Sequence, residues 1–572
     1  MTPQLTSGAM LNAYPDSMGG TLDRTVQFLQ RQEFQGAFDS FYILPSVFHS
    51  DLDRGFSLID YDLNEDLASP ESLEHLRQMG ISLTLDFILN HISVRSPQFQ
   101  DMLRKGYASE YRDFFLDWNK FWVGKGEMTP EGYIRPNEEY IHSMHFRKEG
   151  LPILMIRFPD GKEVPYWNTF YQEIFYDPPT EQTLCSRLGM TEQEAEAVSE
   201  ICRKGIAKGR KPVELEYGEL SSWKPAVTDL LESGRSYLGQ MDLNIQSDTV
   251  RQYYHETLTK LAGYHAKIIR LDAFAYASKV PGKRNFMNDP ETWDLLSSLN
   301  SVAEPHGLTL LPEIHASYGE GTYAILAEKG FPIYDFFLPG LLIDAFIRKS
   351  GAYLCRWGTE LVQKGIQSIN MLGCHDGIPL LDLKGLLPEE DIQRLIATVV
   401  DRGGIVKDLH GAKNVYYQVN ATYFSALGED ENRLLLARAV QMFMPGKPQI
   451  WYLDLFARKN DYAAVQRGGS GAHKEINRTN LTVEEMERAL HSPVVLDQLE
   501  LLRMRNRFSS FQGNAVISFL SDGSRMVITR QGTDSAAVLN VDFSEESFAI
   551  EVTGPNGTIL FQYDSLKNHS AK

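Results

Sequence analysis

Residues 266–274 read AKIIRLDAF, an almost continuous apolar run that carries Arg270 and Asp272 near its C-terminal end. A run this short, bounded by polar residues, is typical of a strand that is covered on both faces. Similar runs recur along the chain at 81–89, 308–317, 331–339, 366–374 and 447–453. Because strands buried on both faces belong mostly to parallel sheets, these runs predict a parallel sheet with helices over it.

Amphipathic helical stretches lie between the predicted strands. In SPESLEHLRQMG (69–80), Ser69 is placed to cap a helix, Pro70 takes its first position and Gly80 ends it. Leu73 and Leu76 fall on one face of that helix, which is expected to be buried. The repeated alternation of strand and helix predicts the α/β class and, at this length, a (β/α)8 TIM barrel.

Three stretches interrupt this alternation and divide the chain. The first two are expected to form long inserted excursions after the third and the seventh barrel strands. From about residue 500 the pattern changes to short alternating strands such as VISFLSDG and RMVITRQG, which predict a small C-terminal β-domain. The predicted units are the barrel (1–91, 243–376 and 426–499), the two excursions (92–242 and 377–425) and the C-terminal β-domain (500–572).

The composition limits the classes of partner. The 572-residue chain has 43% hydrophobic and 23% charged residues, which is ordinary for a globular protein. Its net charge of −19 disfavours nucleic-acid binding, because phosphate backbones need a basic surface. We expect neither a signal peptide nor a membrane span, since the N-terminal sequence has no basic and then apolar leader and no apolar run approaches about 20 residues. Four cysteines without a CxxC pair give no support to structural zinc and fit a reducing compartment, so we expect a cytoplasmic protein.

Acidic residues gather where the predicted strands end. Four carboxylates lie at or just after such ends: Asp86, Asp272, Glu313 and Asp376. The same rim carries four cationic or titratable side chains: His91, Arg270, His315 and His375. A single acidic residue there is most often a cap or half of an ion pair. A whole set on the C-terminal face of a barrel indicates a catalytic site.

These residue types fit the cleavage of a glycosidic bond with retention of configuration. Such cleavage needs one carboxylate that attacks the sugar and one carboxylic acid, about 5 Å away, that protonates the leaving group. Arg270 lies two residues before Asp272 on the same strand, so both side chains point to the same face. We expect the guanidinium to keep Asp272 ionised as a nucleophile, whereas Glu313 needs a raised pKa to act as an acid. Asp376 is expected to stabilise the positively charged transition state.

Four segments resemble the signature regions of the α-amylase superfamily in order and spacing. They are DFILNH (86–91), IRLDAFAYASK (269–279), LPEIHASY (311–318) and CHDGIP (374–379). Further stretches are similar to the sucrose phosphorylase branch: DRGFSLIDY (53–61), YYQVNATYFSALG (416–428), PGKPQIWY (445–452), KNDYAAV (459–465) and EINRTN (475–480). Together these motifs are specific, whereas one of them alone would be weak. The resemblance covers nearly the whole chain except an extra segment at 171–238.

The resemblance implies a role for each matching residue. Asp272 would be the nucleophile, Glu313 the acid/base and Asp376 the transition-state stabiliser. The predicted substrate-binding residues are Asp53, Phe56, His91, Arg270, His315, His375, Tyr417, Gln418 and Arg478. Phe56 is expected either to stack on the glucosyl ring or to be a core aromatic.

The implied reaction is the phosphorolysis of sucrose to α-glucose 1-phosphate and fructose through a glucosyl-enzyme. The branch also acts on sucrose 6′-phosphate, glucosylglycerol and glucosylglycerate, and these substrates stay open, as does a hydrolase or transglucosidase. A catalytically silent barrel is disfavoured because the three carboxylates are present. Inorganic phosphate would be the co-substrate. Some α-amylase relatives bind calcium through the residue at Asn90, but no Asp-rich loop occurs here, so we expect no metal and no other cofactor.

The acceptor-side motifs depart from the branch. Where sucrose phosphorylases commonly carry an Arg-Pro-Arg-like segment, this chain has Arg135-Pro136-Asn137, and where they carry Asp-x-Tyr-Gln it has Val415-Tyr416-Tyr417-Gln418. The extra segment contains Lys204, Lys208, Arg210 and Lys211. These cations are expected to form a solvated helical face rather than a path for phosphate. The segment is also a candidate for contacts in a homodimer.

Overall fold

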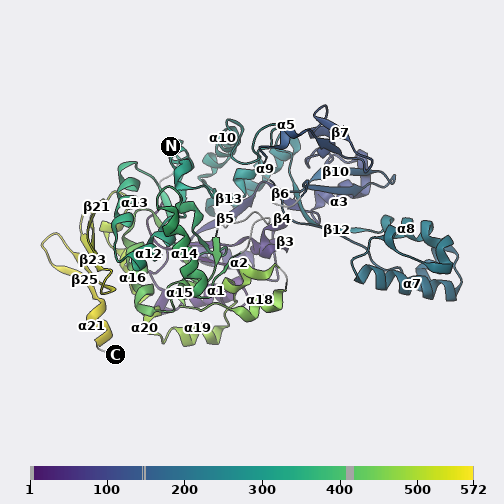
Figure 1. Ribbon diagram of the computed structural model, residues 1–572. Helices are drawn as coiled ribbons and strands as arrows, with labels where there is room; N and C mark the ends of the chain where they lie inside the picture. The colour runs from purple at the N-terminus through teal and green to yellow at the C-terminus, as the bar shows by residue number, and fades with distance from the viewer. Residues whose placement is uncertain (1–4, 145, 147–149, 407–417, 470, 571–572) are drawn as a thin grey trace.

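Eight parallel strands form an almost closed barrel in the computed structural model, which describes residues 5–144, 146, 150–406, 418–469 and 471–570 (Figure 1). The strands are β1 (Met10–Ala13), β2 (Ser40–Ile43), β5 (Ser82–Ile88), β13 (Ala266–Asp272), β14 (Thr309–Pro312), β15 (Ile333–Asp335), β16 (Ser368–Met371) and β20 (Lys447–Trp451). Their hydrogen-bonded order runs from β14 through β13, β5, β2, β1, β20 and β16 to β15. Neighbours in space are therefore neighbours in chain order, which confirms the predicted (β/α)8 barrel.

Helices cover the outside of the barrel. They are α1 (Leu22–Leu29), α2 (Pro70–Gln78), α9 (Asp248–Gly263), α10 (Glu291–Ala303), α11 (Thr322–Glu328), α12 (Leu338–Arg348), α13 (Ala352–Gln363), α16 (Glu431–Phe443) and α20 (Pro493–Arg507). The side chain of Ser69 accepts a hydrogen bond from the Ser72 amide, which confirms the predicted start of α2. Within the described part of the chain, no helix combines the length and apolar character needed to cross a bilayer.

The strand predicted at 331–339 is wrong in extent. The strand β15 spans Ile333–Asp335 only, and Leu338 already begins α12. The side chain of Asp335 accepts hydrogen bonds from the Phe337 and Leu338 amides at 3.2 and 3.1 Å. This carboxylate ends the strand and starts the helix, although the apolar run continues across both elements.

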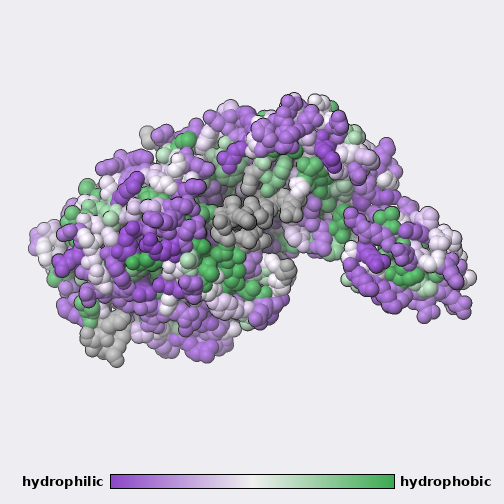
Figure 2. Space-filling model, in the orientation of Figure 1, coloured by the Kyte–Doolittle hydropathy of each residue, from purple (hydrophilic) through white to green (hydrophobic). Residues whose placement is uncertain are grey.

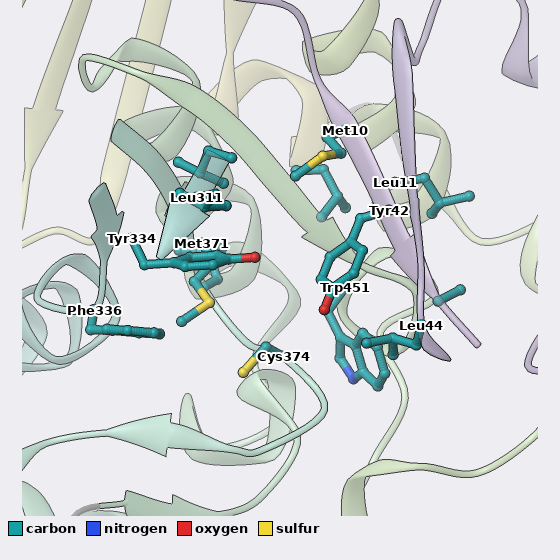
Figure 3. Packing of buried hydrophobic residues seen from close by; sticks show 14 of the residues in the cluster. Met10, Leu11, Tyr42, Leu44, Leu311, Tyr334, Phe336, Met371, Cys374 and Trp451 are labelled. Atoms are coloured by element: carbon teal, nitrogen blue, oxygen red, sulfur yellow. The ribbon is translucent and has the colours of Figure 1, made fainter. Parts of the chain in front are cut away.

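Side chains fill the inside of the barrel, so it is a packed core and not a channel. Figure 3 shows Met10, Tyr42, Leu311, Tyr334, Met371 and Trp451, from strands on opposite sides of the barrel, on its inside, whereas Leu11 points away from them. The Tyr42 hydroxyl donates to Asp86 at 2.8 Å, at the level where the charged groups of the pocket begin. The apolar layer therefore forms the floor on which the site is built.

The first excursion leaves the barrel after β5 and returns through a small sheet. That sheet contains β6 (His91–Ser93), β12 (Ser236–Asp242) and β11 (Gln172–Phe175), and a separate aromatic cluster around Trp118, Trp122 and Trp167 packs beside it. Residues 176–235 form a lobe of three helices, α6 (Glu181–Leu188), α7 (Glu192–Ala207) and α8 (Lys224–Ser233). The lobe has its own hydrophobic cluster and stands away from the barrel (Figures 1 and 2).

The second excursion follows β16 and contains β17 (Ile378–Pro379), η10 (Leu381–Leu383), α14 (Glu389–Asp401), β18 (Ile405–Val406), β19 (Gln418–Asn420) and α15 (Tyr423–Ala426). The chain ends in an antiparallel sheet of β21 (Val516–Asp522), β22 (Arg525–Gln531), β23 (Ala536–Asp542), β24 (Ser547–Thr553) and β25 (Ile559–Asp564). The helix α20 continues to Arg507, so the change of architecture lies between α20 and β21 rather than at residue 500. Buried Arg530 on β22 joins the C-terminal sheet to the barrel, because it donates to the Phe443 carbonyl at the end of α16, at 3.0 Å.

Candidate active site

A pocket of about 510 Å³ opens at the C-terminal ends of the barrel strands. Eight of the predicted site residues line it: Asp53, Phe56, His91, Asp272, Glu313, His315, His375 and Asp376. Two others, Arg270 and Arg478, lie beneath the lining, where they bind its carboxylates. Gln418 is buried on β19, which pairs with β17, and does not appear among the described lining residues. Tyr417 and Val415 lie outside the described residues.

Arg270 connects the carboxylates at the floor of the pocket. Its Nη1 atom lies 2.6 Å from Asp86 Oδ1 and 2.8 Å from Asp272 Oδ1, and its Nη2 atom lies 2.7 Å from Glu313 Oε1. The register of β5 and β13 places Arg270 opposite Asp86, which explains the first contact. One planar guanidinium thus holds the predicted nucleophile and the predicted acid/base side by side. Both carboxylates therefore flank one cation, as a pair that acts on one glycosidic bond must lie close together.

The proton balance of this pair differs from the one expected from the sequence. Burial and the charge of Glu313 raise the pKa of Asp272 well above its usual range, although Arg270 opposes them. Burial alone would also raise the pKa of Glu313, but Arg270 and His315 outweigh it and lower the pKa to about 2. These directions are opposite to those expected for an ionised Asp272 and a protonated Glu313, and the assignment of the proton within this pair stays a prediction. The physical reason is that His315 gives Glu313 a second cation, whereas Asp272 shares Arg270 with Asp86.

Two cations and the His375 ring lie against Asp376. Lys474 Nζ lies 2.6 Å from Asp376 Oδ1, Arg478 Nη2 lies 3.6 Å from the same oxygen, and His375 Nε2 lies 3.4 Å from Oδ2. Burial would raise the pKa of Asp376, but these neighbours hold it well below its usual range. Arg478 also reaches Asp53 at 3.1 Å, so two lining carboxylates share one buried guanidinium. Asp376 is therefore an anion that faces the pocket at neutral pH.

Phe56 and His91 line the same pocket, next to His375 and Asp376. The Phe56 ring stacks on His375 with centroids 4.9 Å apart and an angle of 12°, and Phe56 is 7% exposed, at the pocket. His91 Nε2 donates a hydrogen bond to the Phe56 carbonyl oxygen at 3.0 Å. Burial lowers the pKa of His91 to about 4, so the ring is neutral at physiological pH. Phe56 is thus both packed and available to a sugar ring.

Two residues beside the pocket have left-handed backbone conformations. Asp53 has a φ of 47° and Ala273 a φ of 51°, a region that non-glycine residues rarely adopt. Ala273 follows the predicted nucleophile directly, and its amide donates to Glu313 Oε2 at 3.2 Å. Strained residues of this kind concentrate at functional sites, where the surrounding structure holds them. No pattern in the sequence predicts these two conformations.

A buried ion pair joins the first excursion to the barrel. Lys279 Nζ lies 2.7 Å from Asp242 Oδ2, with side-chain exposures of 2% and 0%. The same ammonium donates to Asn90 Oδ1 at 2.9 Å, and Asp242 accepts from both the amide and the hydroxyl of Thr169 at 2.7 Å. Lys279 lies seven residues after Asp272, and Asn90 precedes His91. This network fixes the strand end that carries His91 against the loop that follows the nucleophile.

The outer part of the pocket comes from loops. Its described residues include Phe170, Gln240, Tyr276, Arg284, Phe286, Glu320, Asp382, Lys384 and Glu389, together with Lys474. Sequence reasoning missed them, because each belongs to a loop or excursion without a periodic pattern. Asn137 stands at the N-cap position of the short helix α5 (Glu138–Ile141), where its side chain makes no capping hydrogen bond. In the lobe, Lys204 pairs with Glu200 at 3.1 Å on the exposed face of α7, as a solvated helical surface does.

Comparison with known proteins places this geometry in a family. No protein-family model matches the chain. The chain is 47% identical to a sucrose 6F-phosphate phosphorylase of Ilumatobacter coccineus, over 99% of both chains. It is 30% identical to a sucrose 6F-phosphate phosphorylase of Thermoanaerobacterium thermosaccharolyticum, over 97% of this chain and 98% of the relative. A crystal structure of sucrose 6F-phosphate phosphorylase from Thermoanaerobacter thermosaccharolyticum superposes with a TM-score of 0.79 at 29% identity, covering 98% of each chain. The chain belongs to the sucrose phosphorylase family of the α-amylase superfamily.

Proposed function

We propose that this protein is a retaining α-glucoside phosphorylase that acts on sucrose 6F-phosphate. It would convert sucrose 6F-phosphate and inorganic phosphate into α-glucose 1-phosphate and fructose 6-phosphate. The observation that carries the reaction type is the single guanidinium of Arg270 in contact with both Asp272 and Glu313 on the pocket floor. The choice of the phosphorylated donor rests on the two relatives of 47% and 30% identity, which are both sucrose 6F-phosphate phosphorylases. Sucrose itself is the second candidate, since a relative from Streptococcus mutans with 28% identity is a sucrose phosphorylase.

In the first step, Asp272 would attack the anomeric carbon of the glucosyl unit. The bond from this carbon to the fructosyl oxygen breaks, and Glu313 gives its proton to that oxygen. This step requires the proton on Glu313 and an ionised Asp272 once the donor is bound. A donor oxygen beside Glu313 and a sugar carbon beside Asp272 favour this arrangement, because the leaving oxygen accepts the proton.

In the second step, a phosphate oxygen would attack the glucosyl-enzyme. It forms the new bond to the anomeric carbon, and the electron pair of the broken ester bond returns to Asp272. The proton of the hydrogen phosphate passes to Glu313, which restores the acid for the next cycle. Two attacks from opposite faces give net retention. Asp376 would stabilise the positive charge on the sugar in both steps, because Lys474 and Arg478 keep it anionic.

The remaining expectations become part of this proposal. Inorganic phosphate is the co-substrate, no metal takes part, and activity survives a metal chelator. The protein acts in the cytoplasm, where phosphorylated sugars are found. A homodimer remains a prediction, and light scattering of the purified protein tests it.

The experiment is run in the direction of synthesis. The purified protein is incubated with α-glucose 1-phosphate and, separately, with fructose, fructose 6-phosphate, glycerol or glycerate, and the release of phosphate is measured. We expect the fastest release with fructose 6-phosphate. Faster release with fructose would move the assignment to sucrose, and release with glycerol or glycerate would move it to the corresponding glucoside. Equal release without any acceptor would identify a hydrolase and refute the phosphorylase.

A further inference from the structure

Three consecutive residues at the tip of one hairpin have left-handed backbone conformations. The hairpin pairs β3 (Phe48–Leu52) with β4 (Ser57–Leu63). At its tip the φ angle is 47° at Asp53, 49° at Arg54 and 110° at Gly55. Glycine adopts such angles freely, and a Cβ atom at Gly55 would lie only 2.1 Å from a backbone nitrogen of the neighbouring loop. Asp53 and Arg54 have no such freedom, so contacts from the rest of the fold must hold them.

The side chain of Arg54 makes contacts of this kind with two other segments of the chain. Its Nη2 atom donates to both carboxylate oxygens of Asp16 at 3.0 Å and to Asn480 Oδ1 at 2.7 Å. Asn480 donates in turn to Asp16 at 2.6 Å, so these polar groups form one network. The Nη1 atom of Arg54 donates to the carbonyl oxygen of Arg478 at 2.5 Å. One guanidinium thus fastens the hairpin tip to the loop after β1 and to the loop that carries Arg478.

These contacts reach both members of an ion pair at the pocket. Arg54 follows Asp53 directly in the chain, and it holds Arg478 by the main chain, while the guanidinium of Arg478 lies 3.1 Å from Asp53 Oδ1. The buried ring of Tyr14 lies against both arginines, with its centroid 4.1 Å from the guanidinium carbon of Arg54 and 5.8 Å from that of Arg478. The side chain of Asp53 lines the pocket and is 44% exposed, so packing around it does not fix its direction.

We propose that Arg54 is a positioning residue that holds the Asp53–Arg478 pair in the orientation that binds the glucosyl unit. Arg54 is not among the described lining residues of the pocket, so it acts through Asp53 and not on the substrate. The inference rests on the proposed function, in which Asp53 binds hydroxyl groups of the glucosyl unit. A lysine cannot replace Arg54, because an ammonium is a point charge without the planar fork that serves several acceptors at once.

A double-mutant cycle tests whether Arg54 acts through Asp53. The value measured is kcat/KM for the release of phosphate from α-glucose 1-phosphate with fructose 6-phosphate as acceptor. In Arg54→Lys we expect it to fall by about tenfold to a hundredfold, since a misplacement of about 1 Å at a binding group has an effect of this size. When Asp53→Ala is already present, the same change should lower it by less than about twofold. The matched control is Arg77→Lys, which breaks a fork to Glu74 on the exposed face of α2 and should keep the wild-type value.

A second variant leaves both Arg54 and the ion pair in place. Asp16→Asn removes only the anionic partner of Arg54, so we expect a two- to fivefold fall in kcat/KM, again only while Asp53 is present. This variant decides the question if Arg54→Lys does not fold, and an unchanged kcat/KM in Asp16→Asn would then overturn the proposal.

An equal loss in Arg54→Lys with and without Asp53 would also overturn the proposal, because Arg54 would then act on the fold as a whole. An Arg54→Lys variant with wild-type activity would do the same. Failure of the proposed function looks different. Phosphate release from α-glucose 1-phosphate that needs no acceptor would refute the phosphorylase, yet the cycle could still be measured on that release, since the glucosyl unit is the same.

Discussion

The two walls of the pocket are built in different ways. On the wall that we term the glucosyl wall, which carries Asp53, Asp272 and Asp376, the lining carboxylates have buried cationic partners, as Asp272 has Arg270 and Asp53 has Arg478. What we term the acceptor wall carries loop residues such as Phe170, Tyr276, Arg284, Phe286 and Lys384, and Arg284 and Lys384 are exposed. A charge lattice anchored in the core cannot adjust to a new sugar without leaving a buried charge unpaired. Loops can change their residues at little structural cost, so under the proposed function we expect the barrel to fix the donor chemistry and the loops to set the acceptor choice.

The strongest test of the glucosyl wall is Asp272→Asn. This change removes the nucleophile but keeps the shape of the side chain, so we expect kcat/KM for phosphorolysis to fall by roughly 10⁴-fold or more. The release of α-glucose 1-phosphate from the donor measures it. Asp248→Asn is the matched control, because the Asp248 side chain at the start of α9 is 96% exposed. Full activity in the Asp272 variant would refute the assignment of Asp272 as nucleophile. It would also refute the view that the glucosyl wall fixes the donor chemistry.

The second test asks whether the first excursion is locked to the barrel by Lys279. Lys279→Met leaves Asp242 as an unpaired buried carboxylate, which costs about 3–5 kcal/mol in the free energy of unfolding. Urea unfolding of the two proteins measures the difference. In the control Lys283→Met the pair with Glu291 is lost at a site where Lys283 is 41% exposed, and about 1 kcal/mol or less is expected. Equal losses in the two variants would show that the buried pair contributes no more than a surface one.

The difference between the walls also explains what could be predicted from the sequence. Buried strands have a local apolar pattern, so the ends that carry Asp272 and Glu313 could be located, and motif resemblance added Asp53 and Arg478 on the same wall. The partners Lys474 and Asp382 come from loops far away in the chain, and no local pattern signals their approach. The charges next to the Asp272–Glu313 pair could not be predicted for the same reason. His315 lies beside Glu313, and this neighbourhood is a property of the folded pocket.

The third test concerns the acceptor wall and follows from the proposed donor. Arg284 is exposed at the pocket and faces solvent, where its attraction for a phosphate group is screened. We expect Arg284→Ala to raise the KM for fructose 6-phosphate by about two- to fivefold in the synthesis direction. The KM for fructose and the kcat should not change. A fall in kcat of tenfold or more would mean that Arg284 contributes to the chemistry, and the two walls would then not be separable. Arg251→Ala, on the exposed part of α9, controls for the loss of a surface charge.

The smallest effect is expected from removal of the lobe. The strands β11 and β12 pair antiparallel up to Phe175 and Ser236, so residues 177–234 can be replaced by an Asn-Gly turn that closes the hairpin. The lobe packs on its own hydrophobic cluster, and none of the described lining residues of the pocket lies within 177–234. We therefore expect kcat/KM to stay within about twofold of the full chain, because no group that touches the substrate is lost.

A tenfold loss would place the basic residues of α7 on the route of phosphate. If the protein without the lobe kept its activity but became a monomer in solution, where the full chain forms an oligomer, the lobe would instead be assigned to subunit contacts. In either case the lobe would have to be counted as a third region with a function of its own, beside the rigid glucosyl wall and the variable acceptor wall.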